Sequence, residues 1–296
     1  AALTISRVTS TTVAAIDQAV VDATGSVSLQ AHNNAGILSG AVAAGIAAQN
    51  ALQGSFVWAD IGNSAQAVVR NTTLGAAALA IDAGNNSQIH TLAGSVAVGG
   101  NNAVGVAANV AWIHDTTHAQ LHDSQIDVAG KVSVDAASDA VTKTLAIGGA
   151  VGGQVAVAGS ASANVIGSTT DAEVVGINLD AQQAGNIGSL QVSADNRGAA
   201  HSLAGAISGG GSTAVGAAVS INTVGGQTSA SVRDAVLGDA SAVQVDAASS
   251  TLINTLAAAG SGSGGASVAG SATTNFINTD TRASLADVSL DNAAAQ

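Results

Sequence analysis

Apolar residues alternate with small or polar residues along most of the chain, with a period of two. The alternation is clearest at residues 92–98 and 104–110, and it returns at Val132 and Val134. A period of two is typical of β-strands, because successive side chains of a strand point to opposite faces of its sheet. Val, Thr, Asn and Gly dominate and no apolar stripe with a 3.6-residue period persists, so helices are not expected. Runs rich in Gly and Asn, such as residues 99–102, predict the turns between strands.

Three short sequence elements recur in a fixed order. The first has the form Val-x-Val-x-Ala, with spacings of 52, 53, 58 and 53 residues, and it starts at Val27, Leu79, Val132, Leu190 and Val243. The second has the form Thr-x-Ala-x-apolar and starts at Thr12, Thr117, Thr170, Thr228 and Thr281, with a deviating copy at Asn63. The third is Thr/Ser-Leu-Ala followed by a Gly-rich turn, and it starts at Thr91, Thr144, Ser202 and Thr255, with a looser form around Leu38. A fixed period of this kind is the signature of a repeat array.

We therefore interpret the whole chain as one array rather than as separate domains. It contains a half repeat, four full repeats and an incomplete one, at residues 1–31, 32–83, 84–136, 137–194, 195–247 and 248–296. The extra residues of the 58-residue spacing fall near residues 176–189 and predict a lengthened loop, since insertions in repeat arrays map to loops. The first residues already match the repeat and the last repeat stops within its pattern, so we expect the array to be a fragment of a longer chain.

The predicted fold class is all-β: an elongated parallel β-solenoid, or β-helix, whose coils stack about 4.8 Å apart. One coil of 53 extended residues, at about 3.3 Å per residue, would make a very wide loop. We therefore expect two or three coils in each repeat, and a rod as the overall shape.

The amino-acid composition limits the possible core, metal sites and partners of the chain. Apolar residues make up 47% of the chain and aromatic residues 1%, so the core must consist of Ala, Val, Ile and Leu in narrow layers. Pro is absent, which suits a chain of hydrogen-bonded strands, and the absence of Cys excludes disulfides and thiolate metal sites. The formal charge of −12 argues against nucleic acid as a partner. The longest apolar runs, such as residues 40–48, are shorter than the roughly 18 to 20 residues of a membrane-spanning helix, so no transmembrane segment is predicted.

Several motifs give the chain a resemblance to known repeats. They are the strand sequence at residues 132–136, the Ala-Val-Gly steps at 103–105 and 214–216, the Ile221-Asn222 step, and the Thr-x-Ala-x-Ile/Leu element. Together they resemble repeats of large Gram-negative secreted surface proteins, namely filamentous-haemagglutinin-like adhesins of two-partner secretion and the fusobacterial leukotoxin type. The resemblance implies a right-handed parallel β-solenoid that is exported across the outer membrane and extends from the cell. This chain departs from a strict unit, because Ala111 and Val57 stand where other repeats have Asn.

Two sets of repeated polar positions could form ladders between coils. Asn164, Asn222 and Asn275 are equivalent, and so are Asp82, Asp135 and Asp246. Stacked carboxylates could bind calcium or a cationic sugar. The structural interpretation is favoured: the Asn residues would satisfy backbone groups at turns, and solvent-facing Asp residues would discourage aggregation of a flat sheet.

The densest cluster of ionisable residues is His114, His118 and His122 with Asp115 and Asp123. Residues four apart on a strand lie on one face but roughly 13 Å apart, which is too far for one metal ion. We interpret the three His residues as solvated outward side chains, and we predict no metal site.

Three aromatic residues, Trp58, Trp112 and Phe276, are assigned to one repeat position, which Val165 and Thr223 occupy elsewhere. They could form a strip that stacks on sugars or binds a partner, although a variable core or corner position is favoured.

The residues do not indicate catalysis. Lys131 and Lys143 are the only lysines and the acidic residues are spread singly, whereas β-helix polysaccharide-degrading enzymes cluster carboxylates in a groove. No catalytic residue, cofactor site or enzyme activity is therefore predicted.

The sequence predicts a structural repeat segment of an extracellular bacterial adhesin or filament at the cell surface. The alternative is a secreted adhesin or toxin whose outer face binds a glycan or a protein, and a β-helix polysaccharide-degrading enzyme is less favoured. The expected partners are further copies of the array, by lateral or end-to-end self-association, and a glycan or another cell-surface molecule.

Overall fold

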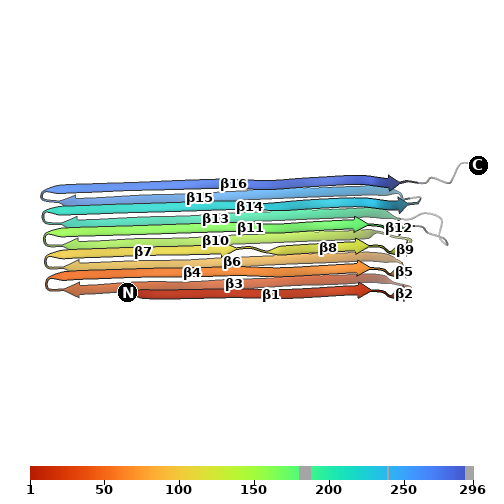
Figure 1. The fold of residues 1–296 in the computed structure, drawn as a ribbon, viewed down its shortest axis with the longest axis horizontal. Helices are drawn as coiled ribbons and strands as arrows, with labels where there is room; N and C mark the ends of the chain where they lie inside the picture. Colours follow the sequence, from red (N-terminus) through yellow and green to blue (C-terminus); the bar gives the residue numbers. More distant parts are fainter. Residues whose placement is uncertain (180–187, 239, 291–296) are drawn as a thin grey trace, which may run out of the picture.

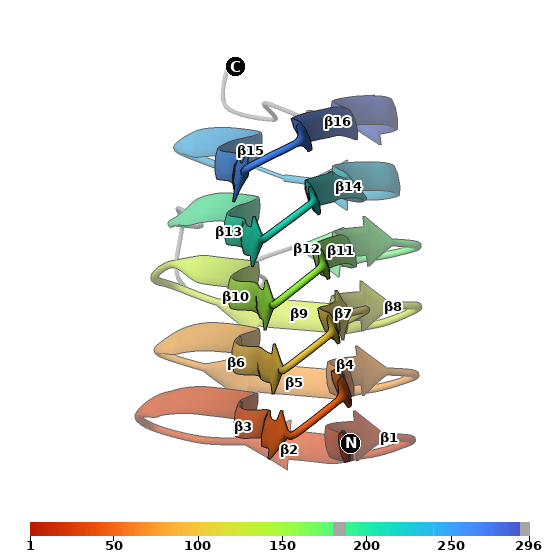
Figure 2. The same ribbon diagram turned by 90° about the vertical axis from the view of Figure 1, so that its left-hand side faces the viewer.

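The computed structural model describes residues 1–179, 188–238 and 240–290. Two large parallel sheets face each other and form a slab that is elongated along the strands (Figure 1, Figure 2). Nearly all described residues belong to strands, and no helix occurs in these ranges. The prediction of an all-β fold with parallel strands is confirmed, and the arrangement fits a β-solenoid.

We name the two sheets A and B. The long strands of sheet A are β1 (Ala2–Asp17), β4 (Asn50–Arg70), β7 (Asn102–Ile113) continued by β8 (Thr116–His122), β11 (Val155–Val175), β14 (Thr213–Leu237) and β16 (Ala266–Ser289). The strands of sheet B are β3 (Ser26–Ala47), β6 (Ala78–Gly99), β10 (Val132–Gly152), β13 (Ser189–Gly210) and β15 (Ala242–Ser263). Short strands lie between the long ones at the right of Figure 1: β2 (Val20–Asp22), β5 (Thr73–Ala76), β9 (Gln125–Val128) and β12 (Asn178–Leu179).

Each repeat forms one coil, and the expectation of two or three coils per repeat is wrong. The first residues of the Val-x-Val-x-Ala elements, Val27, Leu79, Val132, Leu190 and Val243, are successive partners in sheet B. The estimate of a wide loop assumed an open coil. The actual coil is flattened, because its two long strands run in opposite directions and face each other (Figure 1). We call each row of such partners, one residue per coil, a column.

The flattened coil changes the proportions of the molecule. A strand of 22 residues extends about 70 Å, whereas five stacked strands span only about 24 Å. The long dimension of this chain therefore lies along the strands, not along the stacking axis as a thin rod would have it. Many more coils would be needed to make the stacking axis the longer one.

The corner near the end of each long sheet A strand needs a residue in the left-handed conformation, and in β14 and β16 the strand continues past this residue. Its column consists of Gln18, Asn71, Asp123, Gly176, Asp234 and Asp287, all with φ between 45° and 64°. Asn, Asp and Gly tolerate this conformation best. At the opposite end, the turns stack so closely that a Cβ on Gly153 would collide with the carbonyl oxygen of Gly100 in the coil below.

The interior differs between the two ends of the slab. Near the short strands it is filled by large aliphatic side chains such as Leu79, Ile81 and Leu121. Toward the Gly-rich turns the described interior consists mostly of Ala, Ser, Thr, Asn and Gly, with the buried Val57 as a larger exception, and the sheets approach each other closely. A Cβ on Gly148 of sheet B would meet the carbonyl oxygen of Gly159 in sheet A.

The register in the second repeat differs from the sequence alignment by two residues. Ala65, not Asn63, is the partner of both Thr12 and Thr117. Ala59 therefore takes the position assigned to Val57. A shift of two residues keeps every side chain on the same face, so the alternation could not reveal the error. The lengthened loop predicted near residues 176–189 falls largely on residues 180–187, outside the described ranges.

Candidate functional site

The predicted Asn ladder lies inside the slab, not at a turn. The Nδ2 of Asn164 donates to Oδ1 of Asn222 at 2.7 Å, and the Nδ2 of Asn222 donates to Oδ1 of Asn275 at 3.0 Å. Asn164 also donates to Oγ1 of Thr144 in sheet B at 2.9 Å. Asn164 and Asn222 are fully buried in the middle of their strands. The expectation that these residues serve turns is wrong: the ladder links neighbouring coils and the two sheets.

A second Asn ladder was not predicted from the sequence. The Nδ2 of Asn33 donates to Oδ1 of Asn85 at 3.0 Å, and Asn85 donates to Oγ1 of Thr117 in sheet A at 2.8 Å. Both Asn side chains are buried. The recurrence of an Asn-Asn pair after 52 residues, at 33–34 and 85–86, is the signal that could have revealed it.

The Asp column lies on the outer face of sheet B and is interrupted by Ser193. Burial raises the pKa of Asp135, an effect that the nearby Lys131 partly opposes. Asp82 lies 3.1 Å from Nε2 of His32. Among residues 1–179, 188–238 and 240–290, no three His, Cys, Asp or Glu side chains are grouped as metal ligands.

The three His residues of one coil face outward from sheet A, and each is paired with a different carboxylate of an adjacent coil. The Nδ1 of His114 lies 3.2 Å from Asp60, the Nδ1 of His118 lies 3.7 Å from Asp171, and the Nε2 of His122 lies 3.3 Å from Glu173. Burial lowers the pKa of His122. The structure thus resolves the cluster into three separate ion-pair positions and brings no two of these His residues onto one partner.

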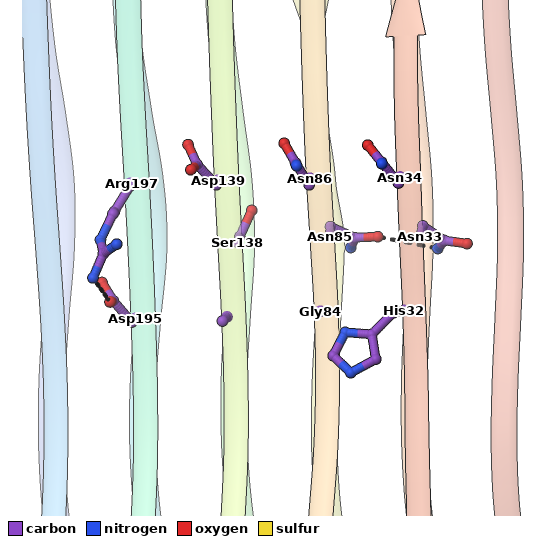
Figure 3. A pocket seen from close by; sticks show the side chains of 11 residues that line it. His32, Asn33, Asn34, Gly84, Asn85, Asn86, Ser138, Asp139, Asp195 and Arg197 are labelled. Carbon is purple, nitrogen blue, oxygen red and sulfur yellow. Dashed lines mark hydrogen bonds and ion pairs between the residues drawn. The ribbon is translucent and has the colours of Figure 1, made fainter.

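A polar groove crosses the outer face of sheet B. Figure 3 shows its lining side chains, and its volume is about 370 Å³. Asn34, Asn86, Asp139 and Arg197 form one column of amide, carboxylate and guanidinium groups along it. In the adjoining column, Gly84 has no side chain, and the ring of His32 occupies the space over it.

The groove is held open by its own contacts. The Nη2 of Arg197 lies 2.6 Å from Oδ2 of Asp195, which keeps the guanidinium along one wall. The ring of His32 lies against Gly84, where a Cβ would collide with its Nδ1. The amide and carboxylate groups of the Asn34 column, in which Asn86 also accepts a hydrogen bond from Gln88 at 3.4 Å, could bind a ligand rich in hydroxyl groups, which can both donate and accept hydrogen bonds.

A wider trough of about 830 Å³ lies further toward the turns on the same face. One wall is the column of Leu38, His90, Lys143, His201 and Asn254, and the other is the column of Leu92, Leu145, Leu203 and Leu256. The ionisable groups His90, Lys143 and His201 thus lie on one side of the trough, and the Leu92 column on the other is purely aliphatic.

All four aromatic residues of the chain are exposed on the outer face of sheet A. Trp112 and Phe276 share a column with Val165 and Thr223, as expected. Trp58 lies in the neighbouring column, because its partner is Val110. Phe56 joins them on the same face, and each of the four side chains is at least 39% exposed. The favoured assignment of these residues to a core or corner position is wrong.

An ion-pair cluster borders the aromatic residues. Asp60 is buried, and its carboxylate lies 3.1 Å from Nε of Arg7 and 3.2 Å from Nδ1 of His114. The His114 ring centroid is 5.4 Å from that of Trp112. His114 thus contacts both the carboxylate of Asp60 and the ring of Trp112.

Comparisons with protein-family models, with curated proteins and with solved structures found no match for this chain. The ranges that the structure describes include no helix with the length and hydropathy of a membrane span. The fold and the two outer faces are therefore the basis for a functional proposal.

Proposed function

We propose that this chain is a structural repeat segment of an extracellular bacterial adhesin or filament, in which stacked coils form a stiff body that projects or assembles at the cell surface. One observation supports this most strongly. Every coil pairs with the next through long parallel ladders in a constant register, such as the 21 successive pairs between β10 and β13. Such an array gains stability from each added neighbour and resists bending.

The geometry favours a broad ribbon over a thin rod. Each repeat of about 53 residues adds only about 4.8 Å along the stacking axis, but it adds a strip of surface about 70 Å long on each face. A ribbon of this kind is better suited to presenting or assembling wide faces than to reaching far with few residues. Right-handed coiling and export across the outer membrane belong to the proposal, and the resemblance to secreted surface repeats supports them.

Surface display is tested on cells that produce the full-length protein. An antibody against this segment is expected to label intact cells as strongly as permeabilised cells. Labelling that appears only after permeabilisation would refute the extracellular role.

The solenoid itself is tested by an in-register deletion. Removing residues 84–136 deletes one whole coil and joins Ala83 to the residue that follows its ladder partner Ala136. The shortened chain should fold with unchanged β-sheet circular dichroism. Removing half as many residues should disrupt the register and prevent folding. If the chain tolerated both deletions equally, a solenoid with one coil per repeat would be contradicted.

A second candidate function, recognition of a glycan by the outer face of sheet B, is favoured by the polar groove in Figure 3. Asn86→Ala combined with Arg197→Ala should abolish binding on a glycan array. The matched variant combines Trp58→Ala, Trp112→Ala and Phe276→Ala on the other face and should leave that binding intact. Loss of binding only in the aromatic variant would assign the glycan site to sheet A instead.

A further inference from the structure

The ionisable side chains avoid one end of the slab completely. The seven Lys and Arg, nineteen Asp and Glu, and six His residues all lie outside residues 40–58, 92–112, 145–165, 203–223 and 256–276. Each of these blocks begins in the Leu92 column of sheet B, passes through a Gly-rich turn and ends at or next to the Trp112 column of sheet A. They stack at the left of Figure 1, and we call them the charge-free end.

The charge-free end carries its large apolar side chains on the outside. Ile147 and Ile207 are exposed on sheet B, and Trp58 and Trp112 are exposed on sheet A, while the interior between them contains small residues such as Ala150. The other end of the slab has the reverse arrangement, with large aliphatic residues inside. Outward apolar side chains at the charge-free end therefore contribute nothing to the core, and their exposure to water is unfavourable in an isolated molecule.

The exposed surface of sheet B has a regular relief. Gly149 lies between Val96 and Ile207 in one column, and in the next column Ile147 lies between Gly94 and Gly205. No backbone atom lies closer than 3.4 Å to where the Cβ atoms of these three glycines would be, so the glycines form open hollows between aliphatic ridges. Surfaces of this kind interdigitate with bulky side chains of a facing sheet, as in dry sheet-to-sheet interfaces.

The area is sufficient for stable association. A face of five strands and about ten residues per strand covers roughly 800 Å². Specific interfaces bury about 800 Å² per partner, whereas an ordinary monomer exposes an apolar patch of no more than a few hundred Å². Each of the two faces of the charge-free end reaches this size.

We propose that the charge-free ends of neighbouring copies of this chain stack face to face. A single closed dimer would leave the second apolar face exposed, so association continues through both faces and produces a lateral assembly. The copies overlap only at their charge-free ends, because superimposing the rest would bring together surfaces of a chain with a net charge of −12. This inference extends the proposed structural role by naming the surface through which the ribbons assemble laterally.

Sedimentation velocity at increasing protein concentration tests the assembly. The unmodified chain should form species larger than dimers, and high sodium chloride should not dissolve them, because burial of apolar surface drives the contact. Ile147→Lys with Ile207→Lys blocks the sheet B face, and Trp58→Lys with Trp112→Lys blocks the sheet A face. Each pair should raise the dissociation constant at its own face at least about tenfold, and combining both pairs should give monomers.

The control variant introduces two Lys residues on the outer face of sheet B, outside the charge-free end. Ala137→Lys with Ala248→Lys, both at exposed positions of sheet B, should leave assembly unchanged. Circular dichroism of every variant should match that of the unmodified chain, since all substituted side chains face outward.

Three results would overturn the proposal. The first is that the unmodified chain stays monomeric. The second is that the variant with both pairs of substitutions assembles as well as the unmodified chain, which would assign the contact to the strand edges of β1 and β16. Alternatively, a monomeric chain could bind phosphatidylcholine vesicles through the same faces, which would make a membrane the partner. Surface labelling of cells is independent of these measurements, so a failure of the proposed structural role would be recognised separately.

Discussion

The Asn ladder of sheet A stops next to two unsatisfied groups, which makes Ala111→Asn an informative substitution. Ala111 is the column partner of Asn164 in the coil below, and Thr91 holds the position that Thr144 has one coil above. Within the described ranges, neither Oδ1 of Asn164 nor Oγ1 of Thr91 has a hydrogen-bond partner, and both are buried. An Asn side chain at position 111 could donate to both oxygens, as Asn164 does to Asn222 and Thr144.

The expected gain follows from the two new hydrogen bonds. Each contributes about 1 kcal/mol net, and leaving a buried polar group unsatisfied costs about 1–3 kcal/mol. The added volume at a fully buried Ala opposes this by about 1 kcal/mol, since overpacking of cores is unfavourable. We therefore expect Ala111→Asn to stabilise the folded chain by about 1–2 kcal/mol.

Urea denaturation followed by the fluorescence of the two Trp residues measures the change, and a double-mutant cycle with Asn164→Ala isolates the ladder contact. The stabilisation should shrink by about 1 kcal/mol in the Asn164→Ala background, because only the hydrogen bond to Thr91 remains there. If Ala111→Asn destabilised the chain equally in both backgrounds, the reasoning that a ladder hydrogen bond forms at this position would be refuted.

Substitutions at three further positions test a turn, a corner and a buried charge. Gly153→Ala should cost at least about 1–3 kcal/mol in urea denaturation, because its Cβ would collide with the turn carbonyl of Gly100 in the coil below. Asp234→Ala should cost about 1 kcal/mol while Asp234→Gly does not, because φ is 50° there and Gly176 occupies the same corner one coil earlier; equal effects would contradict this. Asp115→Asn should raise stability at neutral pH, since burial raises the pKa of Asp115 above its ordinary value of 3.8 and the charged form is unfavourable in the folded state. That gain should shrink as the pH falls through the folded pKa toward 3.8, and a gain independent of pH in urea titrations would rule out the carboxylate as its cause.

The Val-x-Val-x-Ala element shows which features of the fold could be predicted from the sequence. Its recurrence predicted parallel stacking, and its first residues from Val27 to Val243 do form one continuous column. The number of coils per repeat could not be obtained in the same way. Alternation identifies strands but does not show that two strands of 21 or 22 residues fold back against each other with one sharp turn between them.

The candidate sites, like the fold, were only partly predictable from the sequence. The sequence placed Asn164, Asn222 and Asn275 at equivalent positions, but only the facing sheet shows that they donate to one another and to Thr144 inside the slab. The polar groove of sheet B was missed, because its residues come from successive coils at a spacing of 52 to 58 residues. Its individual members, such as Asn86 and Arg197, carry no motif.

The sequence by itself determined that the chain is built of strands, that its repeats are equivalent, and that charged residues are excluded from five regularly spaced blocks. Only the tertiary structure decided which set of alternating residues faces inward. From residue 92 to residue 110 the large apolar residues point outward, although the same alternation near Val132 points Val inward. The physical reason lies in the opposite sheet. Where the two backbones approach as closely as at Gly148 and Gly159, only small side chains fit between them, and the larger apolar residues are left on the surface.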